Sequence, residues 1–529
     1  MTAPPPVPEP ASTPGPDSPF VRFDGRILDP ATAVRLPGVP IPSITAYVGD
    51  TVLVSGGSED RVQEAMRVLG ERAADLGLRI AADPLADGGP RLYRDAVTAG
   101  LPLVVPVVLV PTDATGPTAP VDVWPLVQAI RADGTLPPGT VELDHLMFAA
   151  ASISGNPFGV RGLASISGDP FGVRGLASVN GNPFGVRGLA GGDPSYAYAG
   201  SGGRGPVSVL IDPPVPPADG PRPRVVVLDT GVGRHPWFTA DPVSDALSTP
   251  SGDPIGVDPK DPVAIATAPD GAGAAPDPMT GRLASHAGHG TFICGLLRQT
   301  CPAADIVALR IMDSDGVVPE HRLTDALTGL GLVQAAAPRS IAAVVLALGY
   351  HAEVGDGPYT AGLESQLQDL AGRGVVTVAA AGNDATTQPS YPAAFSVHDW
   401  PAGLPRVVAV AALNPDTSVA LFSNDGDWVT GQAPGANVVS TAPTDAEGSA
   451  GESVGMVDED GRRRGTIDPD DYSSGFATWS GTSFAAPVLA GRYLAALAAR
   501  TAQKNSPPVV SDLAALVPLG RTAGQQGPR

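Results

Sequence analysis

The amino-acid sequence predicts an α/β protein with one large domain built on a mainly parallel β-sheet, a small α/β domain ahead of it, and a repeat-containing linker between the two. After residue 224, short and continuous apolar runs alternate with segments of helical length. Such runs are typical of parallel strands that helices cover on both faces. A shorter series of strands and helices precedes them, and a repeated 13-residue unit marks the linker.

The small domain is predicted over residues 20–150, after a Pro-rich tail at 1–19 that we expect to be disordered. It contains no group of residues with catalytic spacing. Its expected elements are strands at 44–56 and 101–110 and helices at 59–76 and 121–131.

Residues 151–205 form the predicted linker, in which each repeat carries Gly-Asn-Pro or Gly-Asp-Pro, a strong turn signal. Two interpretations stay open. The repeats are an exposed loop without specific chemistry, or a binding strip that displays Phe158, Phe171 and Phe184 between arginines. The three units are 151–163, 164–176 and 177–189.

The large domain is predicted over residues 206–505, followed by a C-terminal tail at 506–529. Ligands of parallel sheets bind beyond the carboxyl ends of the strands, so we expect the chemistry at Asp229, at Gly349 and after Gly382. The expected strands are a short one at 207–211 and then 225–229, 305–312, 341–349, 375–382, 407–413 and 437–442.

Composition excludes several classes of protein. Acidic residues exceed basic ones by 54 − 33 = 21, which argues against a partner that is nucleic acid or an anionic membrane. Cys294 and Cys301 cannot form a disulfide framework and are expected to be buried, reduced thiols. The N-terminal residues lack the features of a secretory signal, so a cytoplasmic location is expected, with non-classical export left open.

Two polar residues mark the first part of a candidate catalytic centre. Asp229 ends the apolar run VVVLD, where a buried strand delivers a carboxylate to the edge of the sheet. His289 stands in HAGHGTFICGLL at the start of an apolar segment, and His286 precedes it by three residues. The two histidines lack the glutamate and the four-residue spacing of a zinc-peptidase helix, so a metal site is not expected here.

Ser483 and Asn383 supply the second part. Ser483 opens an apolar, and therefore buried, helix in WSGTSFAAPVLAG, and the backbone N–H of Ser483 is suited to donate to an oxyanion. Pro487 has no backbone N–H, so the carbonyl of Ser483 lacks its usual helical partner. Asn383 follows the run VVTVAAAG and offers a neutral amide donor at the end of a strand.

These motifs, Asp229 in DTG, His289 in HGT, Asn383 in AAGN and Ser483 in GTSFAAP, resemble those of the subtilisin-like serine peptidases (peptidase family S8), in the same order. The resemblance covers roughly residues 206–500. It implies a three-layer α/β/α domain and a serine endopeptidase, with Asp229, His289 and Ser483 as the catalytic triad and Asn383 with the Ser483 N–H as the oxyanion hole. It also suggests that the 20–150 domain is propeptide-like or regulatory.

The resemblance further implies a set of substrate-binding residues, and the sequence departs from the family's pattern among them. The strand that pairs with substrate commonly reads Ser-Leu-Gly-Gly in the family, and here Tyr350 replaces its last glycine and is expected to narrow a subsite. An apolar primary pocket is expected from the alanines before Asn383. The residues concerned are Ala347, Leu348, Gly349, Tyr350, Ala380, Ala381 and Gly382.

The function predicted is that of an endopeptidase which cleaves proteins or peptides. Latency until the chain is processed or a regulatory partner activates it stays open. The alternative is a non-cleaving or partner-gated scaffold that binds peptides. No cofactor is expected. A structural calcium ion stays open in the long polar insertions at 239–283 and 444–475, although neither contains a complete calcium loop and Asp470 and Asp471 are typical of solvated loops.

Overall fold

The structure is a computed structural model of the whole chain. It describes residues 19–503 except 37–38, 87–88, 113–119, 150–203, 272–275, 277–280, 282, 355–359 and 450. The expectations for the 1–18 tail, the three repeats and the tail after 503 therefore lie outside the described residues, and the division into domains stays a prediction.

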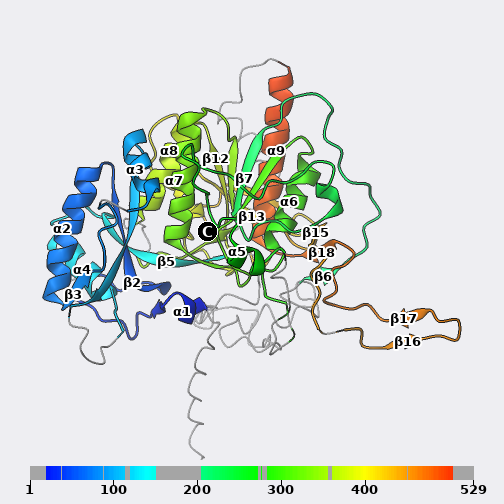
Figure 1. The fold of residues 1–529 in the computed structure, drawn as a ribbon, viewed down its shortest axis with the longest axis horizontal. Coiled ribbons are helices and arrows are strands. Elements are labelled where there is room, and N and C mark those ends of the chain that lie inside the picture. Colours follow the sequence, from blue (N-terminus) through cyan, green and yellow to red (C-terminus); the bar gives the residue numbers. More distant parts are fainter. Residues whose placement is uncertain are drawn as a thin grey trace, which may run out of the picture.

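The large domain is built on a six-stranded sheet in the order β14-β13-β12-β10-β7-β8, in which all pairs are parallel. Helices cover both of its faces (Figure 1). This confirms the three-layer α/β fold. The strands are β7 (Arg224–Asp229), β8 (Asp305–Arg310), β10 (Ala343–Leu346), β12 (Val376–Ala380), β13 (Val408–Leu413) and β14 (Gly431–Pro434).

Alternation along the strands divides the apolar side chains between two cores. Val225 and Val227 of β7 face α6 (His289–Thr300) and α9 (Thr482–Ala502), whereas Val226 and Leu228 face α7 (Glu320–Ala336) and α8 (Ala361–Gly372). Successive strand residues point to opposite faces, so a strand that helices cover on both sides must be apolar throughout. Helix α9 is long and apolar enough to cross a membrane, but it lies in the core and 67% of its apolar window is buried.

Two expected strands lie elsewhere. The run at 437–442 forms β15 (Val438–Thr441), which belongs to a separate antiparallel sheet with β18 (Phe476–Trp479) and β6 (Gly205–Pro206), and β14 takes the sixth place in the parallel sheet. No strand forms at 207–211, and the two-residue β6 lies just before that segment. β15 and β6 both pair with β18, which is distant from β6 in sequence, and an apolar run alone does not indicate its partner strand.

The small domain supplies five strands of a second sheet, which two short strands of the large domain complete. Strand β2 (Thr45–Gly56) pairs with β1 (Gly25–Leu28), β4 (Leu103–Pro111) and β5 (Val141–Ala149), and β3 (Leu78–Ile80) pairs with β4. Three helices of this domain pack with these strands in one apolar core. They are α2 (Glu59–Asp75), α3 (Arg91–Ala99) and α4 (Trp124–Asp133). Strand β5 and helix α3 were not expected from the sequence.

Strand β5 joins the two domains. Its first half pairs with β2, and its last residues lie between two short strands of the large domain, β9 (Val317–Pro319) and β11 (Leu348–Gly349), antiparallel to both. The small domain therefore reaches the large one through backbone hydrogen bonds as well as side chains. The remaining elements are α1 (Pro19–Arg22), η3 (Pro236–Phe238), α5 (Pro262–Ala266), η4 (Ala393–Val397) and a protruding hairpin of β16 (Gly455–Val457) and β17 (Arg463–Gly465), visible in Figure 1.

Candidate active site

A buried aspartate and histidine meet where β7 ends and α6 begins. Asp229 is the last residue of β7 and His289 the first of α6. Nδ1 of His289 lies 2.7 Å from Oδ1 of Asp229, and neither residue is exposed. This contact fixes the orientation of the imidazole. Its Nε2 is buried and has no hydrogen-bond partner among the described residues.

A second buried carboxylate, Asp270, supports this pair and was missed by the sequence analysis. It accepts hydrogen bonds from Thr230 Oγ1 at 2.7 Å, from Gly288 N at 3.1 Å, and from Thr291 N and Oγ1 at 2.7 and 2.6 Å. Burial raises the pKa of Asp270 to about 6, although hydrogen bonds from Thr291 and Thr230 oppose the rise, so the carboxyl is mostly ionised at neutral pH. It lies within the insertion expected to be a solvated loop, and no local pattern distinguishes it.

We expect Asp270→Ala to lower the free energy of unfolding by about 3 kcal/mol, because two buried backbone N–H groups at the start of α6 lose their acceptor. Urea unfolding of the full chain measures this. Asp219→Ala, at an exposed position, is the control and should change stability by less than about 0.5 kcal/mol. Equal stability of the two variants would contradict the structural role of Asp270.

Ser483 lies in the first turn of α9, the long core helix. The first N–H groups of a helix have no partner within it, so those of Thr482 and Ser483 point toward the site. The Ser483 hydroxyl donates to the carbonyl oxygen of Ala347 at 3.0 Å. The ring of Phe484, the next residue, packs against His289 with 5.4 Å between ring centroids, which brings the start of α9 beside the Asp229–His289 pair.

Asn383 follows β12 and contacts the same helix start. Its Oδ1 accepts hydrogen bonds from Thr482 N at 2.9 Å and from Thr482 Oγ1 at 3.0 Å. An oxygen held in this way fixes which end of the amide carries the donor group. Gly382 has φ +103° and contacts Asn424 where a Cβ would stand, so only glycine fits this turn.

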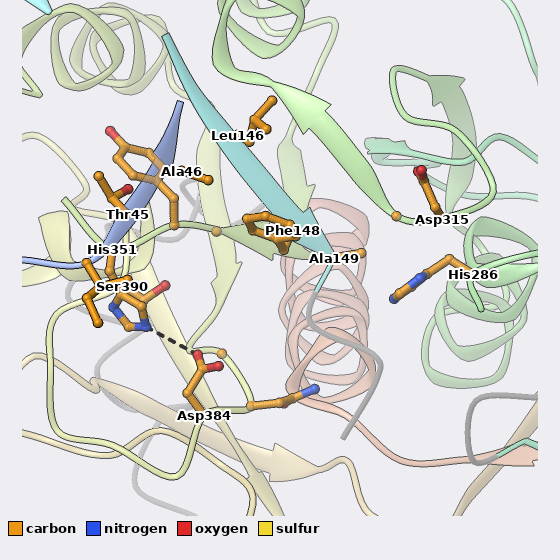
Figure 2. Close-up of a pocket in the computed structure, with 16 residues that line it drawn as sticks. Thr45, Ala46, Leu146, Phe148, Ala149, His286, Asp315, His351, Asp384 and Ser390 are labelled. Carbon is orange, nitrogen blue, oxygen red and sulfur yellow. Dashed lines mark hydrogen bonds and ion pairs between the residues drawn. The ribbon is translucent and has the colours of Figure 1, made fainter. Parts of the chain in front are cut away.

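A cleft is lined by Gly382 and Asn383 and is bounded by the end of β5, by β11 and by the turn at 382–384; Asp229, His289 and Ser483 do not line it. Figure 2 shows Phe148 and Ala149 of β5 between His286 on one side and His351 with Asp384 on the other. Ring nitrogen Nε2 of His351 lies 3.3 Å from Oδ2 of Asp384. Histidine 351 and this carboxylate were not expected in the site from the sequence.

The expected substrate-binding residues fall into two groups. Gly349, Tyr350 and Gly382 line the cleft. The others are buried beside it, and their role in binding stays a prediction; they are Ala347, Leu348, Ala380 and Ala381. Tyr350 also extends toward the small domain, where its ring stacks on His145 with 4.2 Å between centroids.

The last residues of β5 are an extended segment that lies between β9 and β11. Ala149 lies opposite Leu348 and Phe148 opposite Gly349, while Phe148 also lies opposite Val317 of β9. An extended segment between two antiparallel partners satisfies its backbone groups on both sides, which is the geometry of peptide recognition by strand addition.

Two further expectations from the sequence concern metal ions and the two cysteines. The part of the chain that the structure describes holds no cluster of three or more His, Cys, Asp or Glu side chains that could bind a metal ion. Cys294 and Cys301 are buried free cysteines, and burial raises the pKa of both thiols.

An Asp–His pair and a serine at a helix start, at one end of a parallel sheet, define an α/β protein with a candidate Ser-His-Asp site. Residues 220–515, more than half of the chain, match the sequence model of the Subtilase family (Peptidase S8). The chain belongs to the Subtilase family.

Named relatives match smaller parts. The chain is 28% identical to thermitase of Thermoactinomyces vulgaris over 214 residues, which are 39% of this chain and 59% of that protein. It is 29% identical to a thermophilic serine proteinase of Bacillus sp. (strain AK1) over 227 residues, 41% of this chain and 44% of the relative. The chain thus spans about half the length of these two relatives. Fervidolysin of Fervidobacterium pennivorans, a solved structure, is 16% identical with a TM-score of 0.44, over 87% of this chain and 56% of that one.

Proposed function

We propose that this protein is a serine endopeptidase that hydrolyses peptide bonds through an acyl-enzyme on Ser483. The observation that carries the proposal is the buried 2.7 Å contact between Asp229 and His289 beside the helix start that holds Ser483, in a chain of the Subtilase family. His289 would accept the Ser483 proton at Nε2 and return it to the leaving amine, while Asp229 holds the tautomer and stabilises the imidazolium.

In this mechanism the Ser483 hydroxyl exchanges its acceptor, from the carbonyl oxygen of Ala347 to Nε2 of His289. The buried Nε2 of His289 supports this exchange, because it has no hydrogen-bond partner among the described residues and can accept a proton. The proposal is tested by incubating the purified full-length chain with a fluorophosphonate and mapping the modified residue. Labelling of Ser483 is expected, and a chain that stays unlabelled even after its small domain has been cleaved off would overturn the proposal.

The oxyanion of the tetrahedral intermediate would be stabilised by the Asn383 side-chain amide and the Ser483 N–H. We expect Asn383→Ala to lower kcat by about 10²–10³-fold with little change in KM, because the bond forms fully only in the transition state. Steady-state kinetics on an unstructured protein substrate measure both constants. Asn383→Ala also removes the acceptor for Thr482, so the fold of the variant is checked by circular dichroism. A change confined to KM would argue against the oxyanion role.

We further infer that the chain is latent while β5 stays in the cleft. Phe148 and Ala149 occupy the space that an extended substrate would need between β9 and β11. A polypeptide substrate can then bind only after the end of β5 leaves, through cleavage of the chain or through a regulatory partner that displaces the strand.

We expect a self-cleaved chain to be cut within a few residues after Ala149. Ala149 is opposite Leu348, and Ala347, the residue that precedes β11, accepts the hydrogen bond of the Ser483 hydroxyl, so the end of β5 lies next to the nucleophile. Intact-mass measurement of wild type and Ser483→Ala checks this. A single full-length mass for both would leave the small domain as a permanently attached regulator.

A further inference from the structure

A group of buried charges lies where the small domain meets the cleft. Nδ1 of His145, on β5, is 2.8 Å from Oε2 of Glu320 at the start of α7, and Nε2 is 2.9 Å from Oε2 of Glu353. A histidine that donates from both nitrogens is an imidazolium. Arg131 of α4 approaches Glu353 to 2.7 Å, and Tyr350 stacks on the imidazole and donates its hydroxyl to Glu320 at 3.2 Å.

These charges are withdrawn from water. His145, Glu320 and Glu353 are at most 1% exposed. Burying charged groups costs several kcal/mol per ion, and good pairing geometry only offsets that cost, so such a cluster contributes selectivity for its partner more than raw affinity. A neutral or acidic side chain in place of His145 would leave two carboxylates facing each other without a cation between them.

The residues of this buried charged group come from both domains. Glu320, Glu353 and Tyr350 belong to the large domain and remain there when β5 leaves, whereas His145 belongs to the strand that occupies the cleft. His145, Met147 and Ala149 share one face of β5, since they stand two residues apart. Met147 is fully buried in the apolar core that also contains Leu348 and Tyr350.

We propose that Glu320, Glu353 and Tyr350 form a cation-selecting subsite of the cleft, and that His145 is its ligand in the latent chain. The subsite binds an imidazolium, ammonium or guanidinium group at the position of His145, four residues before Ala149. An apolar side chain follows two residues later, at the position of Met147. This inference rests on the proposed peptidase function and names its substrate class. Extended segments with a basic residue at the position of His145 are preferred. The contact of His145 with Glu320 and Glu353 also keeps the small domain attached to the large one.

The subsite gives the hold on β5 a pH dependence. Burial alone would lower the pKa of His145, but the carboxylates of Glu353 and Glu320 outweigh it and raise that pKa to about 10. The histidine of a released strand titrates near 6.5. The free energy that His145 contributes to the attachment of β5 is therefore complete below about pH 6.5 and is lost as the pH rises through about 10. The other titratable or charged groups around it are Arg131, Glu142, Asp144, Glu320, Tyr350 and Glu353.

Glu353 and Glu142 modify the pH range in which β5 is held. Burial opposes the shift at Glu353, but Arg131 and His145 hold the pKa of that carboxyl well below its usual range, so its contribution is present above about 4.5 and is lost in stronger acid. Burial raises the pKa of Glu142, whose contribution falls with rising pH as that of His145 does. The hold is therefore strongest between mildly acidic and neutral pH.

The first test uses the full chain with Ser483→Ala, so that no hydrolysis is involved. Amide hydrogen exchange of peptides that contain Met147–Ala149 reports detachment of β5. We expect His145→Gln and, separately, Glu353→Gln to accelerate this exchange by about 10- to 100-fold at pH 7, the effect of losing a hydrogen bond to a charged group. Arg67→Gln, which removes a positive charge on the exposed face of α2, is the control and should leave the exchange unchanged. Unchanged exchange in both test variants would overturn the proposal.

The second test measures selection by charge. Fluorescent peptides with the sequence of Val141–Ala149 and with Lys or Glu at the place of His145 are titrated into the His145→Gln, Ser483→Ala chain. The His and Lys peptides should bind at least about 10-fold more tightly than the Glu peptide, and Glu320→Gln with Glu353→Gln should abolish the difference. Equal affinities would refute a cation subsite. A chain that a fluorophosphonate never labels would refute the peptidase function alone, since neither binding test depends on Ser483.

Discussion

Ser483→Ala is expected to abolish fluorophosphonate labelling and to lower kcat on an unstructured protein by about 10⁶-fold, because the change removes the nucleophile and the acyl-enzyme cannot form. A residual rate about 10³–10⁴-fold above that in water is expected from the oxyanion hole and from binding. The fold should persist, since alanine removes a single hydroxyl that makes one hydrogen bond, to the carbonyl of Ala347, among the described residues.

The control for Ser483→Ala is Ser449→Ala, at an insertion loop where the hydroxyl donates to the carbonyl of Gly281. That variant should retain wild-type turnover and labelling. Hydrolysis of the substrate by purified Ser483→Ala at the wild-type rate would remove Ser483 from the mechanism, and with it the proposed endopeptidase.

Asp229→Asn is expected to lower kcat by about 10⁴-fold, the second largest effect. The carboxylate accepts the proton at Nδ1 of His289 across 2.7 Å, and an amide that donates to Nδ1 would shift the ring proton to Nε2, the atom that must accept the Ser483 proton. The substrate does not contact this buried aspartate, so KM should change little.

Single-turnover and steady-state kinetics distinguish this effect from a general loss of structure. The unfolding midpoint of Asp229→Asn checks the fold of the variant, because Thr230 N donates to the same Oδ1 of Asp229 that contacts His289. A loss of less than about 10-fold in kcat would show that His289 holds its tautomer without Asp229.

The sequence predicted those site residues that stand at the ends of regular elements. Asp229 closes an apolar strand, His289 opens a helix, and Ser483 opens the most apolar helix of the chain, so each has a local signal. The alternation of apolar runs and helices likewise fixed the parallel sheet, since strands buried on both faces must be continuously apolar. In these cases the local pattern and the tertiary position have the same cause, which is burial.

Only the tertiary structure decided the features that depend on partners distant in sequence. Asp270 has no local pattern, yet four donors from Thr230, Gly288 and Thr291 converge on it. The charged residues of β5 would indicate an exposed strand, but His145 is buried between Glu320 and Glu353, 175 and 208 residues away. The sequence by itself determined the sheet and the candidate triad. It could not determine that β5 fills the cleft or which carboxylates hold it, because a charge can be buried only where folding brings its counter-charge to it, and a sequence pattern does not name that partner.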